Sequence, residues 1–517
     1  MKKSNTQSTK KGFFNIFLDF VEKTGNKLPH PVTLFVIFSF IIIIISAIAE
    51  KAGLHVTFEK IVDGKLTMET VNAISLLNAD GIRKMFSEAV HNFTSFAPLG
   101  TVLVAMLGVG VAEGTGLIQA GLRKLVLSTP KRWITVVVVL AGVVSNIASD
   151  AGYVVLVPLG ALVFLSFGRH PLAGLAAAFA GVSGGFSANL MIGPTDALLA
   201  GITQPAAQML QSDYIVPATG NFYFLFISTF IITIVGTFVT EKIVEPRLGV
   251  YKGKSVATMD TVTKEENKGL KWAGISILVF VMVLLFMVVP QNGILRNPET
   301  GSVLKDSAFI GGIVPIIALL FLIPGVVYGM ASGSVKNDKD IVDSMSNAMA
   351  SMGGYLVLAF VAAQFVNYFT WTNLGTILAV NGAKFLELTG MTGITMIIGF
   401  VIVTAFINLF IGSASAKWAI MAPIFVPMLM RVGYSPEFTQ VAYRIGDSTT
   451  NIISPLMSYF AVIMAFANKY DEDMGIGTLI STMLPYSLMF LISWTMLLIV
   501  WFFIPGLPIG PGSFIRM

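Results

Sequence analysis

The sequence predicts an all-α polytopic membrane protein with about nine transmembrane helices and two re-entrant helical hairpins in an inverted repeat. Of its 517 residues, 55% are hydrophobic and only 12% are charged, whereas soluble domains carry about 25% charged residues. A second observation is a repeat, because Pro158 and Pro423 lie 265 residues apart within interrupted apolar runs. The same offset relates four more pairs, which are Gly168 and Gly433, Pro171 and Pro436, Gly181 and Gly446, and Ser183 and Ser448.

The first half is predicted to cover residues 31–243, after a cytoplasmic N-terminal segment at 1–30. Its first apolar run is long enough to span a bilayer and lacks the cleavage pattern of a signal peptide. Full crossings are expected at 31–50, 95–117, 172–203 and 219–243, the third of them broken. The segment 133–168 is apolar but interrupted by small polar residues, so we expect a hairpin that enters and leaves on one side.

A polar cytoplasmic linker at 244–268 joins the first half to a second half at 269–510. Full crossings of the second half are expected at 270–290, 307–331, 350–368, 437–468 and 475–504, the fourth of them broken. The second re-entrant hairpin is predicted at 393–432, where Gly412–Ser415 interrupts an apolar run. In the external segment 51–94 we expect a short amphipathic helix around Asn78–Phe93.

The placement of lysine and arginine tests this topology. With the N-terminus inside, cytoplasmic segments hold 21 of the 33 basic residues and external segments hold 10, while Lys417 and Arg444 lie at membrane depth. Such a bias is typical of cytoplasmic loops. The first hairpin then opens from the cytoplasm and the second from outside, which makes the repeat inverted.

Composition also excludes several functional classes. The chain has no cysteine, so thiolate metal sites and cysteine nucleophiles are excluded, and its four histidines are scattered without metal-ligand spacing. No cofactor is expected. The net charge of +5 comes from basic residues in short loops, which fits membrane orientation better than nucleic-acid binding. The expected surroundings are therefore a lipid bilayer.

Ionisable residues at membrane depth indicate where function lies. A charge at the bilayer centre costs about 2.5–3.5 kcal/mol on insertion scales, so each needs a partner, a ligand or water. Arg444 and Asp447 are three residues apart and could pair on one helical face. Alternatively, Arg444 binds a substrate carboxylate through its bidentate fork, and Trp418, beside Lys417 after the second hairpin tip, stacks on a flat substrate.

Broken helices expose the hard oxygen ligands that Na⁺ requires. The alternative is that small residues merely allow close helix packing, which suits Gly181 better than clusters of Asn, Asp and Ser. Na⁺ is a candidate ligand at Asn408 and Asp447, and a proton on Asp196 or Asp447 is the other option. The predicted ion-coupling residues are Ser145, Asn146, Ser149, Asp150, Asp196, Asn408, Asp447, Thr450 and Asn451.

Four motifs together resemble the aminobenzoyl-glutamate transporter (AbgT) family, over about residues 12 to 510. They are Ser145-Asn-Ile-Ala-Ser-Asp-Ala-Gly-Tyr153, Gly193-Pro-Thr-Asp196, Lys417-Trp-Ala-Ile-Met-Ala-Pro423 and Tyr443-Arg-Ile-Gly-Asp-Ser448. The resemblance implies a homodimer in the bacterial inner membrane, with nine spans and two hairpins. It also implies movement of p-aminobenzoyl-glutamate and, in some members, export of sulfonamides. By this resemblance Asp196, Trp418, Pro436, Arg444, Asp447 and Pro455 take the positions of functional residues.

The residues and the resemblance together predict a secondary active transporter of p-aminobenzoyl-glutamate or related aromatic carboxylates, driven by Na⁺ or H⁺. The predicted substrate-binding residues are Asn146, Asp196, Ser413, Ser415, Trp418, Pro436, Arg444 and Pro455. The alternative is a carrier of dicarboxylates or other anions from the same superfamily. A channel would need a continuous pore. An intramembrane enzyme would need a dyad of Ser413 or Ser415 with Lys417, and we do not expect an enzyme.

Overall fold

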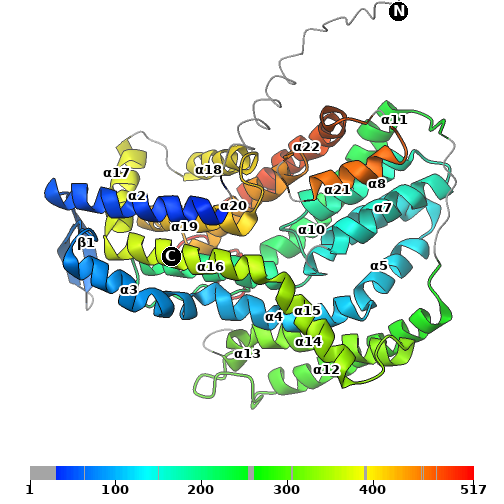
Figure 1. Ribbon diagram of the computed structural model, residues 1–517, viewed down its shortest axis with the longest axis horizontal. Coiled ribbons are helices and arrows are strands. Elements are labelled where there is room, and N and C mark those ends of the chain that lie inside the picture. The colour runs from blue at the N-terminus through cyan, green and yellow to red at the C-terminus, as the bar shows by residue number, and fades with distance from the viewer. Residues whose placement is uncertain are drawn as a thin grey trace, which may run out of the picture.

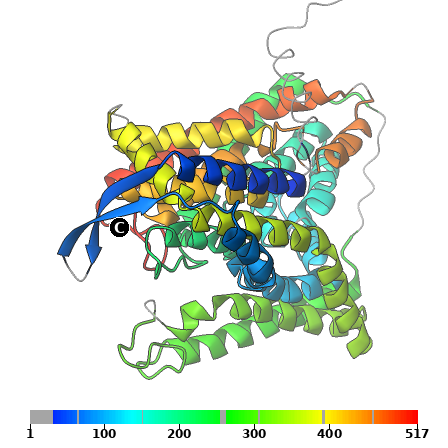
Figure 2. The same ribbon diagram turned by 60° about the vertical axis from the view of Figure 1, so that its left-hand side comes forward.

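The structure, a computed structural model, describes residues 29, 31–62, 65–148, 151–253, 261–303, 307–388, 393–455, 457, 459–472 and 474–517. Regular structure in these ranges is almost entirely helical (Figure 1), which confirms the predicted all-α class. One antiparallel ribbon was not predicted. Its strands β1 (His55–Val62) and β2 (Lys65–Asn72) pair with each other and project from one end of the molecule (Figure 2).

Most helices of the first half follow the predicted segments, and α5 is an additional helix between the segments predicted at 95–117 and 133–168. The predicted amphipathic helix is confirmed as α3, whose N-cap Asn78 accepts a hydrogen bond from the Gly81 backbone N–H at 2.7 Å. The helices of this half are α2 (Pro31–Lys51), α3 (Ala79–Thr94), α4 (Ala97–Gly114), α5 (Leu117–Leu127), α6 (Ile134–Val144), α7 (Ala151–Ser166), α8 (Pro171–Phe179), α9 (Pro194–Gln208), α10 (Phe222–Val239) and α11 (Glu245–Leu248).

The second half adds α15 and α17 to the helices that the sequence predicts. Its helices are α12 (Lys264–Val288), α13 (Ala308–Gly311), α14 (Ile313–Ser332), α15 (Asp338–Ser351), α16 (Gly353–Trp371), α17 (Leu374–Leu388), α18 (Gly393–Asn408), α19 (Ala414–Arg431), α20 (Pro436–Asn451), α21 (Phe460–Asn468) and α22 (Ile476–Phe503). Helices α12 and α14 lie side by side along one edge of the molecule (Figures 1 and 2).

Six described helices are long and apolar enough to cross a membrane, namely α2, α10, α12, α14, α16 and α22. Helices α4 and α5 form a pair bent by 61°, which makes a seventh candidate. The total of nine crossings therefore stays a prediction, because that number counts the two broken segments as full spans.

All four predicted interruptions are breaks in the structure. In the hairpin segments, α6 ends in a 3₁₀ turn at Ser145–Ala148, and α18 ends five residues before Ser413, the N-cap of α19. In the broken spans, α8 passes into a π-helical turn at Ala180–Gly184, and α20 ends at Asn451 before α21 begins. Each break frees backbone groups in the middle of an apolar segment, as a polar site within a membrane requires.

Glycines at equivalent positions bring each broken span against its hairpin. A Cβ added to Gly181 would lie 2.4 Å from the carbonyl oxygen of Val139 on α6. At Gly446, a Cβ would lie 2.5 Å from the carbonyl oxygen of Val401 on α18. Both contacts are between backbones, so a methyl group fits neither place. The repeated glycines therefore mark the same close helix approach in the two halves.

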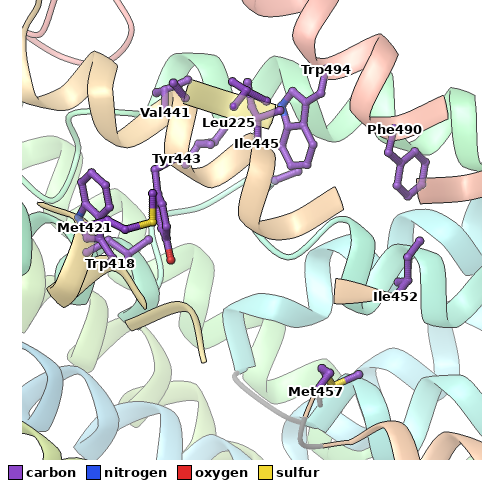
Figure 3. Packing of buried hydrophobic residues seen from close by; sticks show 14 of the residues in the cluster. Leu225, Trp418, Met421, Val441, Tyr443, Ile445, Ile452, Met457, Phe490 and Trp494 are labelled. Atoms are coloured by element: carbon purple, nitrogen blue, oxygen red, sulfur yellow. The ribbon is translucent and has the colours of Figure 1, made fainter. Parts of the chain in front are cut away.

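The core encloses the first helices of the two broken spans. All nine residues of α8 and all sixteen residues of α20 are buried. Around α20 the aromatic side chains of Trp418 and Trp494 approach from different helices (Figure 3). By contrast, α12 exposes large apolar side chains, among them Met282 and Phe286. Such a helix needs lipid or another apolar surface around it.

Candidate functional site

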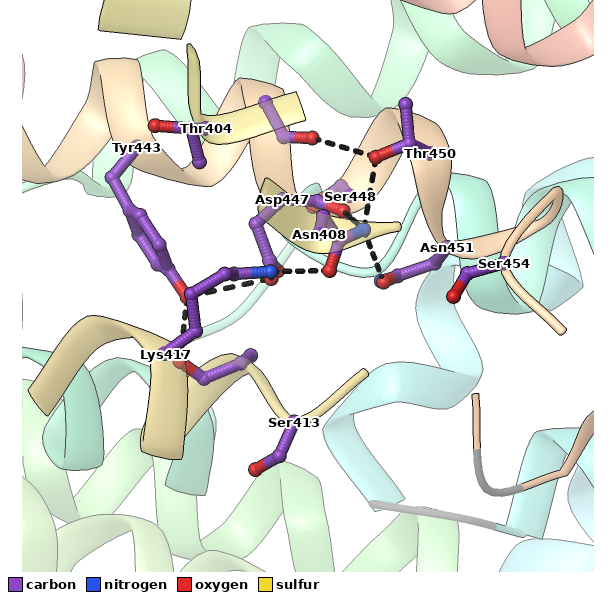
Figure 4. A network of polar contacts seen from close by, with 12 residues as sticks. Thr404, Asn408, Ser413, Lys417, Tyr443, Asp447, Ser448, Thr450, Asn451 and Ser454 are labelled. Carbon is purple, nitrogen blue, oxygen red and sulfur yellow. Dashed lines mark hydrogen bonds and ion pairs between the residues drawn. The ribbon is translucent and has the colours of Figure 1, made fainter. Parts of the chain in front are cut away.

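A buried ion pair lies where α19 and α20 meet the end of α18 (Figure 4). The Nζ atom of Lys417 is 2.5 Å from Oδ1 of Asp447, and the two side chains are 0% and 1% exposed. Lys417 Nζ also donates a hydrogen bond to Oδ1 of Asn408. The ammonium is therefore bound by one charged oxygen and one amide oxygen, both inside the protein.

The side chain of Asn408 is held in one orientation by its amide nitrogen. Nδ2 lies within hydrogen-bond distance of the Asp447 carbonyl oxygen at 2.6 Å, Asn451 Oδ1 at 2.8 Å and Thr450 Oγ1 at 3.0 Å. Thr450 in turn donates to the carbonyl oxygen of Ala405 at 3.0 Å. These contacts leave Oδ1 of Asn408 as the atom that faces a cation.

Asp447 has one further oxygen to offer. Its Oδ1 lies 3.4 Å from the hydroxyl of Tyr443, which donates its main hydrogen bond to the Ala414 carbonyl at 2.5 Å. Its Oδ2 is buried and has no hydrogen-bond partner among the residues that the structure describes. A buried carboxylate oxygen without a donor is costly, so this atom is a candidate ligand for a cation or a proton.

The alternative in which Arg444 pairs with Asp447 is wrong. Arg444 Nη1 instead lies 2.7 Å from Oδ1 of Asp196, which lies in the first turn of α9 in the first half. The i,i+3 spacing puts both charges of α20 on one face, but the helix breaks bring a separate partner to each. Asp196 Oδ2 accepts the Gly193 backbone N–H at 2.7 Å, and the helix N-terminus favours this carboxylate.

Arg444 keeps an unused hydrogen-bond donor. Its Nη1 forms the ion pair with Asp196, whereas its buried Nε has no hydrogen-bond partner in the described part of the chain. The side chain is only 3% exposed. A guanidinium with a free donor in a buried position is suited to receive a planar carboxylate.

Trp418 is fully buried beside this pair. Its ring stacks on that of Tyr443, with centroids 4.3 Å apart and planes at 28° (Figure 3). Its Nε1 donates to Thr203 Oγ1 at 2.8 Å, and Thr203 donates to Gln440 Oε1 at 2.6 Å. Stacking of Trp418 on a substrate stays a prediction, and in this structure the indole stacks on Tyr443.

The first hairpin tip presents several buried oxygens. Ser145 Oγ donates to Gly142 O at 2.7 Å, and Asn146 Nδ2 donates to Val143 O at 3.0 Å. Asn146 Oδ1 and the hydroxyls of Ser183 and Ser187 are buried without hydrogen-bond partners among the described residues. Two other predicted ion-coupling residues, Ser149 and Asp150, lie outside the described residues.

The remaining predicted substrate residues are spread along the second half. Ser413 caps α19, with its Oγ 3.4 Å from that of Ser415, and both side chains are half-buried. Pro455 lies in the irregular segment after α20. Pro436 is the first residue of α20. At 1.5 Å per residue it is about 16 Å along the helix axis from Asp447, so the structure does not bring Pro436 to the ion pair.

A polar cavity of about 530 Å³ was missed by the sequence reasoning. It lies between α4, α7 and α15, and Glu113, Gln119, Asn347 and Tyr459 are among the residues that line it. Its volume suits a small organic molecule. One of its lining residues, Tyr459, stacks on Tyr153, the repeat equivalent of Trp418, with ring centroids 4.6 Å apart.

Comparisons with known proteins agree with this architecture. The model of the AbgT putative transporter family matches residues 16–517. The chain is 40% identical over 497 residues to the p-aminobenzoyl-glutamate transport protein of Escherichia coli (strain K12), covering 96% of both chains. The YdaH transporter of Alcanivorax borkumensis is 47% identical with a TM-score of 0.88, covering 93% of this chain and 100% of that one.

A second solved structure is similar over almost the whole chain. MtrF of Neisseria gonorrhoeae, described with a class of antimetabolite efflux pumps, is 53% identical with a TM-score of 0.91. The match covers 96% of this chain and 100% of that one. These relatives are membrane transporters of one family. The chain, with its apolar helices and two broken spans, belongs to the AbgT transporter family.

Proposed function

We propose that this chain is a secondary active transporter of p-aminobenzoyl-glutamate and related aromatic carboxylates. The buried Arg444 carries the proposal, because its guanidinium lies within the protein and its Nε has no hydrogen-bond partner among the described residues. The name of the Escherichia coli relative supports the substrate. The description of MtrF with antimetabolite efflux pumps supports antimetabolites as further cargo moving outward, and we propose sulfonamides among them, as the family resemblance implies.

The proposed substrate has chemistry that complements the site. Its glutamate carboxylates would bind the guanidinium of Arg444 in bidentate fashion. Its aromatic ring would replace one ring of the Trp418–Tyr443 stack, whose centroids are 4.3 Å apart. Such an exchange keeps the aromatic contact, which contributes about 0.5–1.5 kcal/mol beyond the buried area. Asn146, Ser413, Ser415, Pro436 and Pro455 are proposed as supporting residues.

The coupling ion is proposed to be Na⁺ or H⁺, bound at the carboxylates and oxygens of the breaks. A cation beside Asp447 or Asp196 would offset the negative substrate in a site of low dielectric. Candidate ligands are Ser145, Asn146, Ser149, Asp150 and Asp196 from the first half, and Asn408, Asp447, Thr450 and Asn451 from the second. Oδ1 of Asn408 and Oδ1 of Asp447 can receive a Na⁺ ion only when the Lys417 ammonium leaves them.

The proposed moving unit consists of both hairpin segments and both broken spans. The apolar outer faces of helices such as α12 would stay in the lipid as a scaffold. We further propose a homodimer in the bacterial inner membrane, as the family resemblance implies. Rigid-body movement of one bundle of helices against another is the usual mode of inverted-repeat carriers.

Counter-flow in proteoliposomes tests the proposal. Vesicles loaded with unlabelled p-aminobenzoyl-glutamate should accumulate the labelled compound from outside, and the compound should be recovered chemically unchanged. An enzyme would convert it, and a channel would not exchange it. Competition by aliphatic dicarboxylates, without competition by aminobenzoyl conjugates, would favour the alternative anion carrier.

A second arm of the same assay identifies the ion. We expect uptake to collapse when choline replaces Na⁺ at constant pH. Uptake that survives in choline and is lost when the pH gradient is collapsed assigns the coupling to protons.

A further inference from the structure

We propose that the ammonium group of Lys417 is a tethered cation that fills the second-half cation site of the substrate-free protein, between Asn408 Oδ1 and Asp447 Oδ1. This inference deepens the proposed function. It rests on that function in one respect, namely that these oxygens form a cation site. A mobile Na⁺ is then held by the first half alone, until the ammonium is drawn away.

The contacts of Lys417 are those of a bound cation. Its Nζ is 2.5 Å from Asp447 Oδ1 and donates to Asn408 Oδ1, and its side chain is fully buried. The amide nitrogen of Asn408 is held by three acceptors on α20, so the amide oxygen is turned toward the ammonium. The two oxygens named as Na⁺ candidates are therefore the two that bind the lysine (Figure 4).

The position of Lys417 on its helix shows that the carboxylate holds it there. Lys417 lies in the first turn of α19, after the N-cap Ser413. A helix N-terminus carries a partial positive charge and disfavours a cation. The charge of the Lys417 side chain is therefore balanced by Asp447. Among the described residues, Asp447 forms a salt bridge with no cation other than Lys417.

The first half has no such lysine. The repeat offset puts Gly152 at the position equivalent to Lys417. A Cβ at Gly152 would lie 2.1 Å from Ser145 Oγ, so the first tip has no room for a side chain there. The nearby buried oxygens of Asn146, Ser183 and Ser187 have no hydrogen-bond partners among the described residues. One half thus carries its cation covalently, and the other presents free oxygens.

This asymmetry has a consequence for coupling. If each half bound a mobile ion, a symmetric carrier would move the same number of ions through both repeats. With Lys417 in place, the negative charge of Asp447 is neutralised without an ion from solution. A substrate carboxylate could attract the ammonium, and Na⁺ would then enter the second half only when substrate is present.

Counting bound Na⁺ tests the inference without any transport. The probe is ²²Na⁺ at saturation on the purified full-length protein in detergent, with choline as the balancing salt and no substrate. Lys417→Met should bind one Na⁺ more per chain than the native protein, because Asp447 then needs another cation. The double variant Lys417→Met with Asp447→Asn should return to the native count. Lys271→Met, on the exposed face of α12, is the matched control.

A second variant keeps the test decisive if Lys417→Met folds poorly. Asp447→Asn in the native background should leave the Na⁺ count unchanged, whereas the loss of one Na⁺ would overturn the inference. An unchanged Na⁺ count in folded Lys417→Met protein would also overturn it. The same conclusion would follow if Lys417→Met folded in neither Na⁺ nor choline salt while the double variant folded. Folding of Lys417→Met in Na⁺ but not in choline would support it. Absence of transport in the native protein would refute the proposed function and leave these counts standing.

Discussion

Exchange of Arg444 and Asp196 for neutral residues separates stability from substrate recognition. Arg444→Gln leaves Asp196 buried without its cation, and Asp196→Asn leaves Arg444 without its anion. In the double variant no unpaired charge remains. We expect both single variants to be destabilised and the double variant to recover most of the loss, while none of the three transports substrate.

The size of the effect follows from the contacts. Removal of one partner of a buried ion pair costs about 3–5 kcal/mol. Asp196 retains the hydrogen bond from Gly193 N–H at 2.7 Å, and the Arg444–Asp196 contact itself lacks hydrogen-bond geometry. We therefore expect the lower end for Arg444→Gln, about 3 kcal/mol, or about two powers of ten in the folding equilibrium.

Thermal unfolding of purified protein, together with counter-flow in proteoliposomes, measures both quantities on the same samples. The double variant should lose less stability than the sum of the losses in the two single variants, because the two residues are in contact. Additive destabilisation would show that the pair is not formed in the protein. Restored transport in the double variant would show that Arg444 serves only as the counter-charge of Asp196.

Three further predictions concern packing, a hydrogen bond and pH. Gly446→Ala should cost about 1–3 kcal/mol, because its methyl group meets backbone on α18, whereas Gly274→Ala, with no atom within 4 Å, should not lower the melting temperature. Trp418→Phe keeps the stack but loses the bond to Thr203, which should lower stability by about 1 kcal/mol on thermal unfolding. Hydrogen bonds from two backbone N–H groups lower the pKa of Asp340. The contribution of this carboxylate to stability is therefore present above the ordinary carboxyl pKa and is lost as the pH falls through the lowered value. The melting temperatures of Asp340→Asn and of the native protein should accordingly differ at neutral pH and become equal in acid.

The breaks could be predicted from sequence because small polar residues interrupt apolar runs that are otherwise long enough to span. Gly181 and Gly446 could likewise be paired, since both keep the same offset and both meet a backbone carbonyl of the neighbouring hairpin. The breaks are visible in the local composition, and the glycine pair is visible in the repeat that relates the two halves of the sequence. The family resemblance was confirmed by the family model, which matches residues 16–517.

Charge partners could not be predicted in this way. The i,i+3 spacing of Arg444 and Asp447 favours a local pair, but Asp196 and Lys417 reach them from other helices. These partners depend on how the broken ends meet in space, which spacing along one helix does not contain. The ribbon of β1 and β2 was missed because the external segment gives only a short and mixed pattern.

Two stacked aromatic pairs join hairpins of opposite halves to the same broken span. Trp418 of α19 stacks on Tyr443 of α20, and Tyr153 of α7 stacks on Tyr459, just before α21. Withdrawal of one hairpin from this span breaks one pair and leaves the other intact. Withdrawal of both together would lose both contributions, about 0.5–1.5 kcal/mol each. Each pair therefore adds its own cost to the withdrawal of its hairpin, so the two contacts together favour a state in which both hairpins and this broken span stay packed as one body.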